Sequence, residues 1–122
     1  LALAGTGVHS WRGATPEQVL FSAFDKDWRL GVAADPAACE LQRLGSTNDV
    51  AQNHPDVVRD LHTAAIDEIA RRGLDPALVA WLRSKGTRPF PMEFRVTDAK
   101  PAPEGWRAGY WGRFYNSLGL PT

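Results

Sequence analysis

Four neighbouring residues near the start of the chain, His9, Ser10, Trp11 and Arg12, combine an imidazole, a hydroxyl, an indole and a guanidinium. Arg with His could hold a sulfate or phosphate group, because a guanidinium donates paired hydrogen bonds to such oxygens. We therefore take His9 and Arg12 as candidate anion or substrate contacts. The alternative is a surface loop with a buried Trp, and the spacing leaves both interpretations open.

The two other histidines, His54 and His62, suit structural positions better than chemical ones. No two histidines are four residues apart and no HExxH motif occurs, so the pattern of a helical zinc site is absent. His54 directly precedes Pro55, a position typical of a helix entrance. His62 borders an apolar helical stripe, where we expect it to pack.

Cys39 is the single cysteine, which excludes an internal disulfide and a zinc site built on several thiolates. Its neighbours Ala38 and Glu40 offer nothing that would lower the pKa of the thiol, so we expect a buried, unreactive side chain. A lone thiol fits a reducing compartment, yet exported proteins without disulfides are common. A bacterial cytoplasmic and a periplasmic location both stay open.

Three aspartates, Asp25, Asp27 and Asp35, could be imagined as paired carboxylates, but each lies in a predicted turn. Asp is common in turns because its side chain accepts hydrogen bonds from nearby backbone N–H groups. The phosphate-binding patterns GxGxxG and GxxxxGK[ST] and the nucleophile pattern GxSxG are absent. The sequence therefore predicts no catalytic residue, no cofactor-binding residue and no metal ligand in this chain.

The overall composition is that of a globular protein with a core, since 43% of the 122 residues are hydrophobic and 23% are charged. Lys and Arg together number 14, as do Asp and Glu, so the net charge is zero and no nucleic-acid partner is expected. No apolar run approaches the ~20 residues that span a bilayer, so no membrane partner is expected. The short apolar start lacks the basic region of a signal peptide, and the missing initial Met suggests processing or a piece of a longer protein.

Short strands are predicted at residues 19–24, 28–32 and 39–44, separated by polar turns. Cys39 and Leu41 should face inward, with Leu44 as a further inward candidate. Together these strands predict an antiparallel meander. A fourth strand is predicted at residues 92–96.

A helix is predicted from Pro55 to residue 72, because proline suits a first helical turn and Gly73 suits a helix end. Its apolar stripe has spacings of 3, 4 and 4 residues and consists of Val58, Leu61, Ala65 and Ile69. A shorter helix begins at Asp75-Pro76 and is closed by Gly86.

The last residues of the chain are rich in aromatic side chains and are preceded by a proline-rich segment. These types are enriched at interfaces, so the tail either folds back over its own domain or docks onto another chain or domain. The candidate interface residues are Trp106, Tyr110, Trp111, Phe114 and Tyr115.

The predicted fold class is α+β, with a small antiparallel sheet of three to four strands packed against a C-terminal helix and followed by an irregular aromatic-rich tail. Residues 1–18 are expected to be a loop or the end of a preceding domain. Residues 19–86 hold the sheet and helices, and residues 87–122 hold the proline-rich segment and the tail.

Several segments resemble the C-terminal subdomain of sulfatases, within the alkaline-phosphatase-like superfamily. Residues 27–31 (DWRLG) are similar to that subdomain's first strand, and residues 40–44 (ELQRL) to its second. Residues 49–58 (DVAQNHPDVV) are similar to the loop end and helix start that follow. Residues 1–5 (LALAG) resemble the close of the last helical segment of the catalytic domain. The similarity covers residues 19–85, and more weakly 1–18.

The departures from the family concern both structure and catalysis. Gln42-Arg43 stands where the family has Tyr-Asp, the Asp-Pro-x-Glu turn is missing, and Phe24 stands at a position that often carries Arg. The family's formylglycine precursor lies in Cys/Ser-x-Pro-x-Arg, and no proline follows Cys39 in that pattern. The metal-binding carboxylates lie upstream in the family, so no active-site role transfers to this chain.

The resemblance implies a non-catalytic C-terminal part of a hydrolase that cleaves sulfate or phosphate esters. Such a part would support the catalytic α/β domain, its main partner, and edge the substrate cleft. Calcium or magnesium would belong to the parent enzyme, with no cofactor in this chain. The alternative is a free-standing binding or assembly domain that docks or oligomerises through its aromatic tail.

Overall fold

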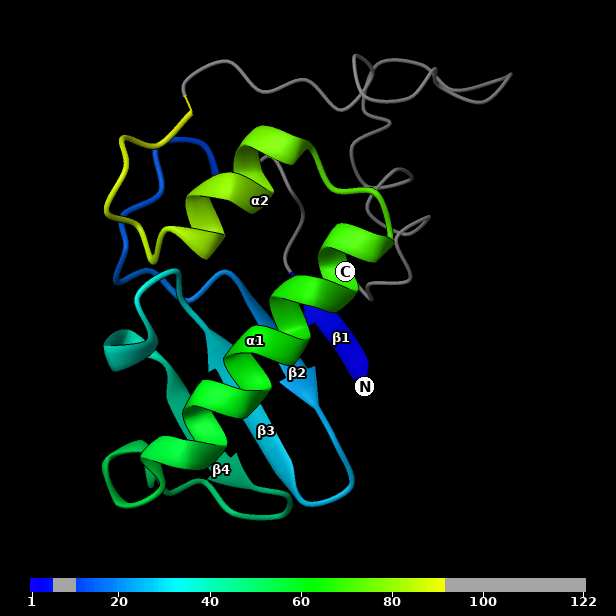
Figure 1. Cartoon of the computed structure of the whole chain (residues 1–122). Coiled ribbons are helices and arrows are strands. Elements are labelled where there is room, and N and C mark those ends of the chain that lie inside the picture. Colours follow the sequence, from blue (N-terminus) through cyan, green and yellow to red (C-terminus); the bar gives the residue numbers. More distant parts are fainter. Residues whose placement is uncertain (6–10, 92–122) are drawn as a thin grey trace.

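Four strands form one antiparallel sheet in which sequential neighbours pair, so the strand order is β1-β2-β3-β4. The structure is a computed structural model and describes residues 1–5 and 11–91. Figure 1 shows one helix across the meander and a second beyond the ends of its strands, and this combination of sheet and helices makes the fold α+β as predicted. The strands are β1 (Ala2–Gly5), β2 (Phe21–Phe24), β3 (Trp28–Val32) and β4 (Glu40–Arg43).

Aspartates shape the two turns that join the central strands. The Asp25 carboxylate accepts hydrogen bonds from the backbone N–H of Asp27 at 2.8 Å and of Trp28 at 2.6 Å, which closes the β2–β3 turn. Asp35 caps a short 3-10 helix, η2 (Pro36–Ala38), by accepting from the N–H of Ala37 at 2.9 Å. The prediction that these aspartates serve turns is confirmed.

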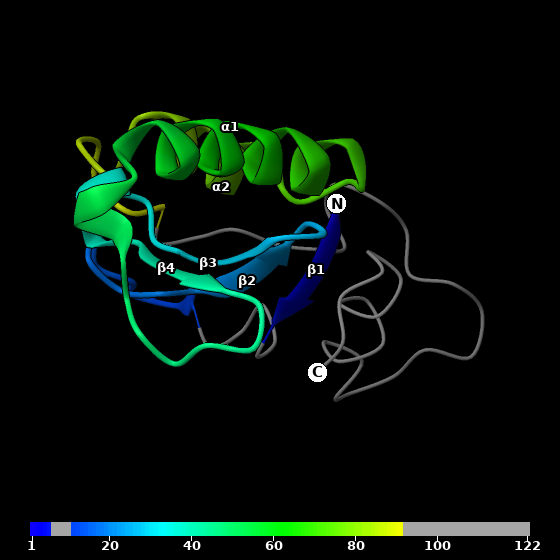
Figure 2. The ribbon, with the colours of Figure 1, turned by 90° about the horizontal axis from the view of Figure 1, so that it is seen from below.

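The long helix α1 (Pro55–Arg71) lies across one face of the sheet (Figure 2). Its bounds agree with the predicted helix to within a residue, and a second 3-10 helix, η3 (Ala51–Asn53), leads into it. The whole predicted stripe is buried: Val58, Leu61, Ala65 and Ile69. Burying such side chains stabilises the fold by roughly 1.5–3 kcal/mol for each large one.

The face of the sheet that meets α1 is apolar because alternate residues of each strand point to the same side. The strand register pairs Leu3 with Ala23, Ala23 with Leu30, and Leu30 with Leu41. All four side chains are buried, and the hydrophobic core lies between them and α1.

The shorter helix α2 (Pro76–Arg83) packs against α1 and begins with Asp75 as its cap, as predicted. Gly86 follows it with a φ of +74°, which L side chains adopt rarely. A Cβ atom at Gly86 would lie 2.6 Å from the Cβ of Pro16. Glycine is therefore required here both by backbone conformation and by space.

The structure differs from the sequence analysis at the N-terminus, where Ala2–Gly5 forms the edge strand β1 instead of a loop or the end of another domain. The run Ala-Leu-Ala-Gly carries little strand propensity, so its pairing with β2 is visible only in three dimensions. Leu44 is also not inward, since 48% of it is exposed after β4 ends at Arg43. The predicted strand at 92–96 and the aromatic tail lie outside the described residues.

Candidate functional site

The structure places only part of the predicted anion-binding loop. Arg12 is exposed, whereas Trp11 is fully buried and stacks on Phe21 with ring centroids 5.8 Å apart. The Trp11 Nε1 atom is buried and has no hydrogen-bond partner in the described part of the chain. His9 lies outside the described residues, so the juxtaposition of His9 with Arg12 stays a prediction.

His62 and Cys39 hold the same piece of backbone in the core. The Nε2 atom of His62 lies 2.9 Å from the carbonyl oxygen of Ala33, and the Cys39 thiol lies 3.7 Å from that oxygen. The Ala33 N–H in turn donates to the Cys39 sulfur at 3.4 Å. Ala33 and Ala34 are fully buried just after β3, so these side chains satisfy polar groups that water cannot reach.

Burial shifts the pKa of both groups toward the neutral form. Desolvation is the main cause that lowers the pKa of His62, and the positive charge of Lys85 lowers it further. The hydrogen bonds to the backbone of Ala33 and Ala34 and the negative charge of Asp35 act in the opposite direction. Desolvation raises the pKa of the Cys39 thiol to about 11. A thiol of that kind is a poor nucleophile, as expected from the sequence.

His54 lies at the entrance of α1, as predicted, and is the N-cap residue without a side-chain cap hydrogen bond. Its ring packs against Trp28 with centroids 5.0 Å apart, and the Arg43 guanidinium lies 4.4 Å above the same Trp28 ring. This cluster carries no signal in the sequence, because Arg43 and His54 approach Trp28 only through strand pairing and the η3 loop.

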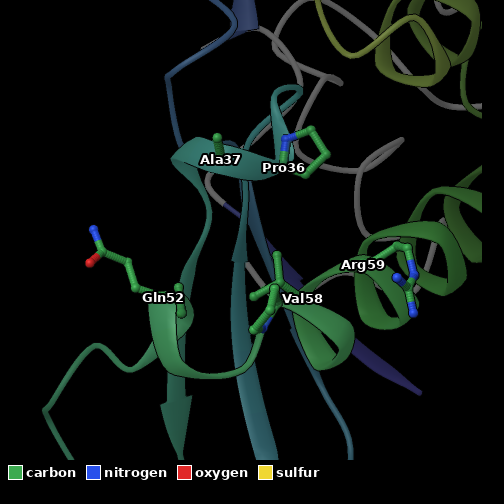
Figure 3. Close-up of a pocket in the computed structure, with 7 residues that line it drawn as sticks. Pro36, Ala37, Gln52, Val58 and Arg59 are labelled. Atoms are coloured by element: carbon green, nitrogen blue, oxygen red, sulfur yellow. The ribbon is translucent and has the colours of Figure 1, made fainter.

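A hollow of about 390 Å³ lies beside the N-terminal turn of α1, and Figure 3 draws the residues that line it. Val58 points toward η2, where Pro36 and Ala37 close the other side. Arg59 extends away from the hollow and pairs with Asp56 at 3.3 Å and with Asp60 at 3.5 Å. The walls are mainly apolar, so this hollow offers contact area and no catalytic group.

The second face of the sheet, opposite α1, has a different character, and no described helix covers it (Figure 2). We call this the open face. The strand register assigns to it Ala2, Ala4, Ser22, Phe24, Arg29, Gly31, Glu40 and Gln42. Several of these residues are small, and one of them, Gly31, is buried with Val19 packed close above it.

Arg29 is the main charged group near the centre of the open face. Its NH1 atom donates to the Gln42 side-chain oxygen at 3.1 Å and lies 3.9 Å from a Glu40 carboxylate oxygen. Arg29 also lines a hollow of about 240 Å³ beside Ala4, Val19 and Ser22. The open face therefore combines small side chains with one guanidinium that Gln42 and Glu40 hold in place.

Neither metal ligation nor a membrane span is found in the part of the chain that the structure describes. Residues 1–5 and 11–91 contain no group of three or more His, Cys, Asp or Glu side chains arranged to hold a metal ion. None of the helices in these ranges is long and apolar enough to cross a membrane. The candidate interface residues Trp106, Tyr110, Trp111, Phe114 and Tyr115 lie outside the described residues.

Comparison with known proteins gives no relative: no family model, no curated protein and no solved structure matches the chain.

Proposed function

We propose that this chain is the non-catalytic C-terminal part of a sulfatase-like hydrolase of sulfate or phosphate esters. The observation that supports it is the position of the similar segments in the fold. Residues 27–31 fall on the turn into β3 and on β3 itself, residues 40–44 fall on and just after β4, and His54-Pro55 begins α1. This order of strand, strand and helix is the one that the resemblance implies.

The open face gives this proposal a physical contact surface. α1 already buries one side of the sheet, while small side chains such as Ala4 and Ser22 occupy the other. A larger catalytic domain packed there would bury these residues and pair with Arg29. The sheet would then hold the edge of the substrate cleft in place.

No residue of this chain is assigned to the chemical step. In the family the nucleophile and metal ligands lie in the catalytic domain, and the calcium or magnesium of the presumed parent belongs there too. The contribution proposed for this chain is to stiffen and position that domain. The isolated 122-residue chain should therefore not hydrolyse aryl sulfates or phosphate esters.

The test is to capture the native polypeptide from its source with an antibody raised against this chain. We expect an intact mass several times the 13.4 kDa of the chain, and hydrolysis of an aryl sulfate or aryl phosphate by the captured protein. A captured species of 13.4 kDa without hydrolase activity would overturn the proposal. That result would favour a free-standing module that docks through its aromatic tail.

A further inference from the structure

A small hollow lies where α1 passes the C-terminal turn of α2. Its volume is about 220 Å³, and its walls are His62, Thr63 and Ile66 from α1 with Leu82, Arg83 and Lys85 from the α2 side. Ile66 and Leu82 are buried and form an apolar floor, whereas Thr63, Arg83 and Lys85 are exposed and form the rim. The hollow thus brings two cations and a hydroxyl together above an apolar base.

Of the two cations at the rim, Lys85 has no carboxylate partner among the described residues. Arg83 donates to the Asp67 carboxylate at 2.8 Å, which holds its guanidinium in place. The Lys85 ammonium makes no ion pair or hydrogen bond with any residue in the described ranges. Its charge is also felt by the His62 ring, whose pKa it helps to lower. A small anion placed between Lys85 and Thr63 would meet one positive charge and one hydroxyl.

The backbone at Lys85 is unusual for a lysine. Its φ is +60°, which makes it the one residue other than glycine with a positive φ in the described part of the chain. This left-handed conformation is unfavourable for a residue that carries a Cβ atom, and glycine is the usual choice after a helix end. The turn is fixed by hydrogen bonds from Lys85 N–H to the Leu82 carbonyl at 3.0 Å and from Gly86 N–H to the Trp81 carbonyl at 3.2 Å. A lysine therefore stands where glycine would serve the fold better, and observed strain of this kind points to a role for the side chain.

We propose that this hollow is a binding site for a small oxyanion or carboxylate. The Lys85 ammonium and the Thr63 hydroxyl would donate hydrogen bonds to the anionic oxygens, while the Arg83 guanidinium, whose charge Asp67 balances, would border the site. Charged donors make hydrogen bonds about twice as strong as neutral ones, which suits a shallow site with few contacts. Such a site would be present whether or not the chain belongs to a hydrolase.

The direct test is a titration of the full chain with sodium phosphate, sodium sulfate and sodium acetate, each at constant ionic strength, followed by two-dimensional ¹H–¹⁵N NMR. We expect saturable shifts that cluster at the amides of Thr63, Arg83, Lys85 and Gly86 for at least one of these anions. The anion that saturates distinguishes an oxyanion site from a carboxylate site. Absence of saturation below about 10 mM for all three anions would overturn the proposal, because binding that weak is worth less than about 3 kcal/mol.

Three variants separate binding from folding. Lys85→Gln should lower the affinity for the anion about tenfold or more, since it removes a charged donor. Lys85→Gly should lower the affinity for the anion equally. It should also raise the midpoint of thermal unfolding, because glycine adopts the left-handed backbone conformation without strain. Lys26→Gln removes the same charge from the exposed β2–β3 turn and should bind like the original chain. Unchanged affinity in Lys85→Gly, or equal losses in Lys85→Gln and Lys26→Gln, would contradict the proposed site.

Discussion

At the scale of single residues, the groups that first suggest chemistry serve the core. His62 and Cys39 both contact the backbone of Ala33, where the chain leaves β3 and is buried on all sides. A buried peptide group without a partner costs about 1–3 kcal/mol, so each side chain has a structural reason to be polar. Their ionisable character then makes stability depend on pH.

His62 should make the protein less stable in mild acid. Because burial lowers the pKa of His62 below 6.5, the unfolded state binds more protons as the pH falls through 6.5, and the free energy of unfolding decreases. His62→Gln keeps a donor for the Ala33 carbonyl but does not titrate, so its stability should change less between about pH 7 and pH 5. Urea unfolding at both pH values measures this, with His54→Gln as the control. If the original chain and His62→Gln lose the same free energy of unfolding between these pH values, His62 does not have this role.

Cys39 should have the opposite effect in alkali. The thiol contribution is fully present below the unfolded-state pKa of 9.0 and is lost as the pH rises toward about 11, because only the unfolded chain releases the proton in that window. Cys39→Ala should be less stable at neutral pH but should lose less stability between these two values. Urea unfolding across this pH window tests the prediction. Separately, if Cys39 reacts with a disulfide reagent as fast in the folded protein as in the unfolded protein, its thiol is not buried.

At the scale of elements, α1 is the part that organises the fold. Leu61 is 8% exposed and packs into the core beneath the helix. Leu61→Ala should therefore lower the free energy of unfolding by about 2–5 kcal/mol. Asp60→Ala, at the exposed neighbouring position, should change it by less than about 0.5 kcal/mol. Chemical denaturation of both variants gives the comparison, and a cost below about 1 kcal/mol for Leu61→Ala would mean that α1 is not docked as described.

Two glycines with positive φ, one after β4 and one after α2, offer a second comparison. Gly45 has a φ of +87°, and a Cβ atom added there would meet no other atom within 4 Å, whereas a Cβ at Gly86 would clash with Pro16. Gly45→Ala should cost about 1–2 kcal/mol from backbone strain alone, and Gly86→Ala should cost about 1–3 kcal/mol more. Thermal unfolding of the two variants measures the difference. Equal destabilisation would show that the loop of Pro16 does not press on this turn.

The sequence predicts some elements well because local signals determine them. Proline, the apolar stripe and Gly73 fix the limits of α1, and aspartates mark the turns around β3. β1 was missed because Ala-Leu-Ala-Gly becomes a strand only through its pairing with β2, far along the chain. The hollow at Lys85 was missed for a similar reason, since Thr63 and Lys85 meet only when α2 packs on α1.

At the scale of the whole molecule, the two sides of the sheet differ in a way that bears on function. One side is closed by α1, and the open face presents small side chains around Arg29. A catalytic domain packed on this side, as we propose, would bury these small side chains. The aromatic tail, including Trp106 and Trp111, is expected to add contacts of its own to such an assembly.

A charge placed on the open face tests most directly whether that face supports a catalytic domain, as we propose. Ser22→Glu should lower the rate of aryl sulfate or aryl phosphate hydrolysis by the native polypeptide about tenfold or more, because a longer charged side chain at this small position would hold the catalytic domain away from the face. Thr47→Glu adds the same charge at an exposed loop position and should leave that rate unchanged. The isolated chain should keep its unfolding midpoint in both variants. A native polypeptide that hydrolyses the ester equally fast with Ser22→Glu and with Thr47→Glu would contradict the account.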